Sequence, residues 1–319
     1  MGMLVFLENH GGELQKGSLG VLGKAASLGG DVVGVVLGSG VKELAGAAGR
    51  YGASKVFVAD APELEAPLPQ PRVDALAQLV REQGIDTVLF AASVLASDLA
   101  AGLAARLDAG LNWDLVDVTE QDGSLVGKRP ALEDTVYADV GWTSDVKLAL
   151  FRPGSFDPAE SGGEAAVEDF SPTFEDFSTR ASMLEQAHEE SEGPSIEDAD
   201  VIVAAGRGLG GPENFSLVED LAKALGGAVA ATRAVVDAGW YPYATQVGQT
   251  GKTVSPKLYV ACGISGAIQH KVGMQASGTV VAINKDPNAP IFEFCDLGVV
   301  GDLHEIVPKL TELVKQRKS

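Results

Sequence analysis

The stretch DVIVAAGRGLGGPENFSLVEDLAKALGG, residues 200–227, decides the fold. It begins with an apolar run over 200–206, passes through a cluster of glycines, and continues as an amphipathic segment over 215–226 that ends at a Gly pair. A short apolar run, a Gly-rich turn and a helix with Gly at its C-terminal end are typical of one strand–helix unit of a parallel sheet. We therefore predict an α/β domain around this stretch.

The chain after this stretch repeats the alternation. Strands are predicted within 228–239 and over 257–263 and 279–286, and helices over 265–277 and 304–316. The strands are almost continuous apolar runs, which indicates that both faces of the sheet are covered. Residues 199–319 are therefore predicted to form a Rossmann-like domain with a parallel sheet.

The first half of the chain also alternates between strands and helices. Strands are predicted over 3–8, 31–38, 55–60 and 86–93, and helices near 13–28, 41–51, 72–84 and 96–109. Three further segments, 124–132, 135–144 and 146–156, are typical of consecutive antiparallel strands. We predict an N-terminal α/β domain over 1–190, with a parallel sheet and antiparallel additions.

Charge and composition limit the classes of function. The formal net charge is −20, so nucleic acid is not an expected partner. The acidic stretch 156–200 is interpreted as a solvated connector, with a linker over 191–198. No apolar run is long enough to insert into a membrane, the two cysteines and four histidines lack metal-ligand spacing, and a cytoplasmic location is expected.

The loop QVGQTGKTVSP, residues 246–256, contains Gly251-Lys252-Thr253, which matches the last three residues of the phosphate-binding P-loop motif. That motif requires a Gly at position 246, where this chain has Gln246. Ser255 followed by Pro256 predicts an extended exit instead of a helix. A P-loop is therefore excluded.

The glycines at 206, 208 and 211 fit the dinucleotide fingerprint G-x-G-x-x-G. The acidic residue expected about 20 positions later is missing, and Arg233 lies in that region. An arginine there favours a 2′-phosphate, so an NADP-dependent oxidoreductase subunit remains an alternative. A Gly-rich turn without a ligand, in a protein that serves as a cofactor-free scaffold, is a further alternative.

Polar and basic residues follow several predicted strands. Arg207, Thr232, Arg233 and Asn284 each come at or just after a strand end, and Ser265 is expected to cap a helix that carries His270 one and a half turns in. The carboxyl ends of parallel strands meet at one edge of a sheet, where ligands bind. One extended ligand with phosphate groups is predicted to contact all of them.

The segments GRGLGGPENFSLVEDLA, TRAVVDAGW, QVGQTGKTVSPKLYVACGISGAIQH and VAINKDPNAPIF together resemble the α-subunit of electron transfer flavoprotein. The resemblance is tight over 199–319 and looser but colinear over the N-terminal domain. It implies FAD as the cofactor of the C-terminal domain and a heterodimer with a β-subunit that carries AMP in typical members. It also implies an electron carrier without substrate turnover, which takes electrons from dehydrogenases such as those of acyl-CoA in fatty acid oxidation. The acceptor would be a quinone oxidoreductase.

The resemblance also implies individual FAD contacts. Arg207 and Thr232 are contacts, with Thr232 standing where the family often has Ser, and Arg233 lies against the isoalloxazine ring. The loop on the flavin side is Val247, Gly248, Gln249 and Thr250, with the Thr250 hydroxyl at N5. The pyrophosphate and the ring edge are held by Ser265, Gly266, Ala267, Ile268, Gln269 and His270, with His270 at the C2 carbonyl. The adenosine side is contacted by Asn284, Asp302 and Leu303. A guanidinium and a His donor beside the ring would favour its reduced forms.

Overall fold

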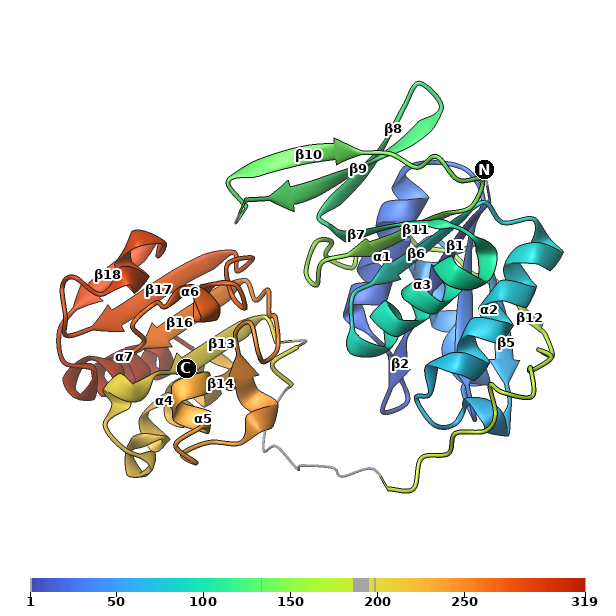
Figure 1. Ribbon diagram of the computed structural model, residues 1–319. Helices are drawn as coiled ribbons and strands as arrows, with labels where there is room; N and C mark the ends of the chain where they lie inside the picture. The colour runs from blue at the N-terminus through green and yellow to red at the C-terminus, as the bar shows by residue number, and fades with distance from the viewer. Residues whose placement is uncertain (1, 133, 186–194, 198, 319) are drawn as a thin grey trace. The chain divides into compact units, whose positions relative to one another are not determined.

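The computed structural model describes residues 2–132, 134–185, 195–197 and 199–318. It divides into two compact units, Met1–Gln186 and Ala187–Ser319 (Figure 1). Residues 191–194 and 198 of the predicted linker lie outside the described residues. Both units are α/β with a parallel sheet, so the predicted fold class is confirmed.

A seven-stranded parallel sheet forms the centre of the N-terminal unit, in the order β12-β5-β4-β1-β6-β11-β7. Its strands are β1 (Met3–Phe6), β4 (Val32–Gly38), β5 (Lys55–Asp60), β6 (Thr87–Ala91), β7 (Gly110–Leu115), β11 (Lys147–Phe151) and β12 (Ala166–Asp169). The helices between them are α1 (Lys16–Ser27), α2 (Pro69–Gln83) and α3 (Val94–Leu107), with 3-10 helices η1 (Lys42–Tyr51) and η2 (Pro62–Leu64). Along β1, Leu4 and Phe6 enter one hydrophobic cluster while Met3 and Val5 enter the other, because successive side chains of a strand point to opposite faces.

Two predicted segments near the N-terminus differ in detail. The expected helix over 13–28 is preceded by a hairpin of β2 (Asn9–His10) and β3 (Glu13–Leu14). Gly11 and Gly12 make its turn with φ of 60° and 82°, a region that favours glycine. The segment expected as a helix over 41–51 is the 3-10 helix η1.

The antiparallel additions are only partly as predicted. Strands β8 (Asp117–Gln121), β9 (Ser124–Ala131) and β10 (Val136–Val140) form a separate antiparallel sheet, which projects from the N-terminal unit in Figure 1. The prediction that 146–156 is antiparallel is wrong, because β11 lies between β6 and β7 and is parallel to both. Four of its five residues are buried, as expected for a strand covered on both faces.

The acidic connector contains a strand that the sequence did not reveal. β12 pairs in parallel with β5 at the edge of the sheet, and all four of its residues are exposed. Glu168 forms an ion pair of 2.7 Å with Lys55, and Asp169 forms one with Lys42. An exposed edge strand needs no apolar alternation, so hydrophobic periodicity could not find it.

A six-stranded parallel sheet forms the centre of the C-terminal unit, in the order β15-β14-β13-β16-β17-β18. Its strands are β13 (Val201–Ala205), β14 (Ala228–Thr232), β15 (Gln246–Val247), β16 (Leu258–Cys262), β17 (Thr279–Asn284) and β18 (Leu297–Val300). Its helices are α4 (Ser216–Leu225), α5 (Arg233–Val236), α6 (Ile268–Lys271) and α7 (Leu303–Lys318), with 3-10 helices η3 (Arg207–Leu209), η4 (Pro212–Asn214), η5 (Tyr243–Thr245) and η6 (Pro290–Glu293).

Helices and loops cover opposite faces of this sheet. Val218 and Leu221 of α4 and Val307 of α7 pack with Val203 and Ala205 of β13. The other face is covered by residues of loops and short helices, which include Ile264, Met274 and Ile291. Each face thus buries an apolar layer, as the nearly continuous apolar strands require.

The chain order places a switch point at the middle of this sheet. After β13 the chain continues to β14 on one side, and β16 pairs with β13 on the other side. The loops that follow β13 and β16 therefore leave the sheet in different directions. Ligands of open parallel sheets bind outside the carboxyl ends of the strands at such a point.

Candidate functional site

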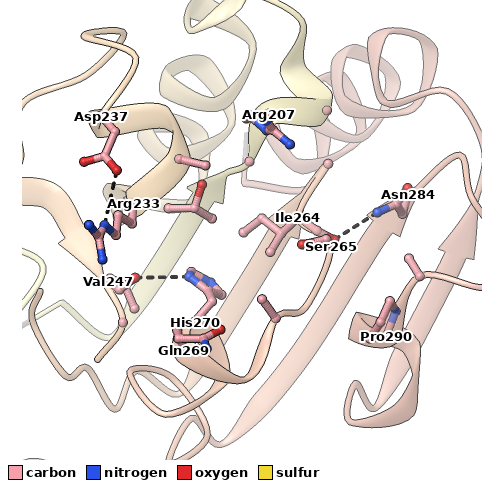
Figure 2. Close-up of a pocket in the computed structure, with 18 of the residues that line it drawn as sticks. Arg207, Arg233, Asp237, Val247, Ile264, Ser265, Gln269, His270, Asn284 and Pro290 are labelled. Carbon is pink, nitrogen blue, oxygen red and sulfur yellow. Dashed lines mark hydrogen bonds and ion pairs between the residues drawn. The ribbon is translucent and has the colours of Figure 1, made fainter. Parts of the chain in front are cut away.

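A cavity of about 770 Å³ lies at the carboxyl ends of the strands of the C-terminal unit (Figure 2). Its volume is within the roughly 300–1,000 Å³ of typical ligand and cofactor sites. It brings together most of the predicted site residues, which follow β13, β14, β15, β16 and β17. These are Arg207, Thr232, Arg233, Val247, Gly248, Gln249, Thr250, Ser265, Ala267, Gln269, His270 and Asn284.

Four predicted residues do not line this cavity: Gly266, Ile268, Asp302 and Leu303. Gly266 packs against the backbone of Ile291, and Ile268 is exposed. Asp302 precedes α7, and its Oδ1 accepts a hydrogen bond of 2.9 Å from the N–H of His304, as a helix cap does. Leu303 is buried in the core. Contacts of these four residues with a ligand stay predictions.

Glycines let the two loops at the switch point meet closely. The N–H of Gly208 donates to the carbonyl of Gly263 at 3.0 Å. A Cβ atom added to Gly206 would lie 2.3 Å from the oxygen of Gly263, and one added to Gly208 would lie 2.7 Å from its Cα. Gly206 and Gly208 of the fingerprint therefore serve this contact, and they line the cavity with backbone instead of side chains.

Two arginines give the cavity its positive charge. Arg233 begins α5, and its Nε lies 3.2 Å from Oδ2 of Asp237, an ion pair whose side chains are 65% and 63% exposed. Arg207 begins η3 and has no ion-pair partner among the residues that the structure describes. Figure 2 shows both side chains at the rim of the same space as Ser265 and His270. A guanidinium on a rim of this kind suits phosphate groups.

The loop after β15 is held by its own backbone. The N–H of Gly251 donates to the carbonyl of Gly248 at 2.9 Å. The N–H of Gly248 donates to the backbone carbonyl of Lys252 at 3.1 Å. The ammonium of Lys252 forms an ion pair of 2.9 Å with Glu197 and does not line the cavity. In a P-loop the lysine contacts the phosphates of the bound nucleotide. The position of Lys252 therefore agrees with the exclusion of a P-loop from the sequence.

His270 is buried between two partners. Its Nδ1 lies 3.1 Å from the carbonyl of Val247, and its Nε2 lies 3.0 Å from the hydroxyl of Tyr259. A carbonyl only accepts, so Nδ1 carries the hydrogen and the Tyr259 hydroxyl donates to Nε2. Burial lowers the pKa of His270 to about 4, against the opposing effect of the hydrogen bond to Val247. The imidazole is thus neutral at pH 7, and a donor role toward a ligand, which stays a prediction, requires one of these bonds to break.

The helix expected over 265–277 is wrong in its start and its length. Only Ile268–Lys271 is helical, and the residue that precedes it is Ala267, not Ser265. Gly266 has φ of 89°, and the carbonyl of Ser265 accepts from the N–H of Ile291 at 2.9 Å, so the chain is still irregular there. Asn284 supports this loop by donating from Nδ2 to the carbonyl of Ile264 at 2.9 Å.

Three residues of the site were missed from the sequence. Asp237 lies four positions after Arg233, a helical spacing that could have revealed the ion pair. Gln246 occupies the position where the P-loop Gly was sought, and its side chain bonds to Thr250. Tyr259 lies inside an apolar strand, so no sequence signal distinguishes it from a core residue.

Segments of both units match known proteins. Residues 195–275 match the family model of the electron transfer flavoprotein FAD-binding domain, and residues 3–175 match that of the electron transfer flavoprotein domain. Electron transfer flavoprotein subunit alpha of Thermoanaerobacterium thermosaccharolyticum is 39% identical over 98% of both chains. The chain belongs to the electron transfer flavoprotein α-subunit family. Its relatives in this family include the subunits alpha of Bacillus subtilis, 38% identical over 98% of this chain and 97% of the other, and of Mycobacterium tuberculosis, 42% identical over 99% of both.

Membership of this family confirms the resemblance and the predicted FAD cofactor. The segment matched as FAD-binding contains the loops after β13, β14, β15 and β16, which form most of the cavity. The NADP-dependent alternative is disfavoured, since it rested on the fingerprint and Arg233 alone. Among the described residues, no helix has the length and apolar character to cross a membrane. The cytoplasmic location stays a prediction.

Proposed function

We propose that this chain is the FAD-binding subunit of a heterodimeric electron carrier. It takes electrons from flavoprotein dehydrogenases, such as those that oxidise acyl-CoA, and passes them to a quinone oxidoreductase. The observation that carries the proposal is the cavity at the switch point, whose loops lie mostly in the segment matched as an FAD-binding domain. Bound FAD would supply the electron-accepting ring, while the chain supplies binding, orientation and charge.

The lining of the cavity fits an extended dinucleotide. Gly206, Gly208 and Gly263 line the cavity without side chains, so a ligand can approach their backbone. We assign the pyrophosphate to the loop that starts at Ser265, and Arg207 to a nearby phosphate, because its charge has no ion-pair partner among the described residues. Asn284 is assigned to the adenosine side, at the end of β17.

The ring is assigned to the other end of the cavity. Arg233 is exposed on the cavity wall, and its positive charge favours a ring that has gained electrons. The loop of Val247 to Thr250 lies on the same side. Its backbone is joined to the loop after β16 by a hydrogen bond of 2.7 Å from the N–H of Gln249 to the carbonyl of Gln269. We place the Thr250 hydroxyl at N5 of the ring and His270 at its C2 edge.

A partner subunit is part of the proposal. We propose that a β-subunit, with AMP in its own site, packs on the N-terminal unit. The N-terminal unit exposes large apolar side chains on β7, on β10 and between β9 and β10, namely Trp113, Leu132, Val136 and Tyr137. A group of this kind is a common feature of interaction surfaces. No substrate turnover by this chain is proposed.

The test is the absorption spectrum of the protein purified together with its β-partner. The proposal predicts a yellow complex with a flavin band at about 450 nm and one FAD released per α-subunit on denaturation. A colourless complex that binds no added FAD would refute it, and would leave an NADP-dependent subunit or a cofactor-free scaffold. Titration with NADP⁺ under the same conditions separates those two.

A further inference from the structure

Gln246 is a buried polar residue beside the cavity. It begins β15 and is 2% exposed. Its side-chain amide nitrogen lies 3.0 Å from the carbonyl oxygen of Thr250 and 3.2 Å from the Thr250 hydroxyl. Thr250 itself is exposed and lines the cavity. One buried amide group therefore contacts both acceptors of a single cavity residue.

These contacts fix the direction of the hydrogen bonds. The Thr250 carbonyl can only accept, so the amide end that faces it is the NH₂ group and not the oxygen. That NH₂ group has two hydrogens, and the second one is directed to the Thr250 hydroxyl. The hydroxyl accepts from Gln246 and so keeps its own hydrogen for another acceptor. Since Thr250 lines the cavity, a bound ligand can supply that acceptor.

Further hydrogen bonds hold Thr250 in position. Its carbonyl accepts a second hydrogen bond, of 3.0 Å, from the hydroxyl of Tyr243. The backbone carbonyl of Gln246 accepts from the N–H of Lys252 at 2.7 Å, which closes the loop on the other side of Thr250. These hydrogen bonds restrict the backbone of the turn that carries Thr250, and so they restrict the position of its hydroxyl.

We propose that Gln246 is a positioning residue that makes the Thr250 hydroxyl a hydrogen-bond donor to the ligand. The inference rests on the proposed function, in which Thr250 lies at N5 of FAD. In oxidised FAD this nitrogen is an acceptor, whereas after two-electron reduction it carries a hydrogen and becomes a donor. A hydroxyl that Gln246 polarises as a donor favours oxidised FAD over reduced FAD. Gln246 and Arg233 therefore act on the affinity for reduced FAD in opposite directions.

The test compares Gln246→Met, Thr250→Val and the double variant, each purified with the β-partner. The ratio of the affinities for oxidised and reduced FAD follows from the dissociation constant and the reduction potential. Gln246→Met should lower this ratio about fivefold, the size of one neutral hydrogen bond, because the hydroxyl loses the hydrogen bond that polarises it as a donor, and both of its lone pairs can then accept from reduced FAD. In the Thr250→Val background the same substitution should have no effect.

Two results would overturn the inference: an unchanged ratio in Gln246→Met, or equal effects of this substitution with and without the Thr250 hydroxyl. Wild-type protein gives a second measurement that needs no variant. It should bind oxidised FAD about fivefold more tightly than 5-deaza-FAD, in which a C–H group replaces N5. Equal affinity for the two would also refute the donor role. A wild-type complex that binds no FAD would instead refute the proposed function.

Discussion

The Tyr259 hydroxyl lies 3.0 Å from Nε2 of His270, and both side chains are buried, with His270 lining the cavity. Tyr259 belongs to β16 and His270 to α6, so the contact joins the sheet to the loop that follows it. Burial holds the imidazole neutral, and in this form Nδ1 donates to Val247 while Nε2 accepts from Tyr259. A neutral histidine in the folded state makes stability depend on pH.

Acid should destabilise the protein through His270. The unfolded chain takes up a proton near the ordinary histidine pKa of about 6.5, whereas burial lowers the pKa in the folded chain to about 4. The stabilisation is therefore complete above pH 6.5 and is lost as the pH falls toward 4, with a total of at most about 3 kcal/mol. Urea unfolding at pH values across this window measures it.

His270→Gln cannot titrate and should have a smaller slope of unfolding free energy with pH over this range. The exposed His304 provides the matched control, so His304→Gln should keep the slope of the wild type. If wild type and His270→Gln have equal slopes, His270 is not held neutral in the folded state.

Asp237→Asn should raise the reduction potential of bound FAD. The substitution removes the negative charge 3.2 Å from Arg233, so the guanidinium acts on the ring without compensation. The relative affinity for reduced FAD should rise severalfold at low ionic strength and less in high salt, because the pair is exposed. A potentiometric titration at two salt concentrations measures both effects. Asp220→Asn, an exposed position on α4 outside the cavity lining, should leave the potential unchanged; a lower potential in Asp237→Asn would contradict the role of Arg233.

Gly206→Ala should damage the cavity and the fold together. Its Cβ would lie 2.3 Å from the oxygen of Gly263, so one of the two loops must move. We expect a loss of about 1–3 kcal/mol in the free energy of unfolding, and at least a tenfold weaker affinity for FAD. Urea unfolding and fluorescence titration with FAD measure these. Gly141→Ala adds a Cβ that meets nothing within 4 Å and is the control; equal behaviour of the two variants would show that the close contact is unimportant.

Arg152→Met should destabilise the N-terminal unit. The guanidinium is 14% exposed and donates from Nε to Asp114 at 2.8 Å and from Nη1 to Asp134 at 2.7 Å, and these hydrogen bonds raise its pKa. Loss of both carboxylate contacts should cost about 2–3 kcal/mol, measured by urea unfolding. Arg50→Met removes only an exposed contact of 3.9 Å to Glu160 and should cost less than about 1 kcal/mol. Equal losses for both variants would mean that burial of the Arg152 network adds nothing.

The strands of both sheets were largely predictable because their signal is local. β4, β5, β13 and β16 are short apolar runs that end at polar or glycine residues, and the structure keeps their bounds within about two residues. The partners of a strand are not local information. β11 was therefore expected to be antiparallel, and the exposed β12 was not expected at all.

The sequence alone determined the α/β class, the family resemblance and the set of residues at strand ends, since motifs and periodicity are properties of neighbouring positions. Only the tertiary structure decided what those residues contact. It pairs the ammonium of Lys252 with the carboxylate of Glu197. It also surrounded His270 with Val247 and Tyr259, and set Gln246 behind Thr250. Hydrogen bonds and burial depend on atoms brought together from distant parts of the chain, and these fix the protonation and polarity of the site.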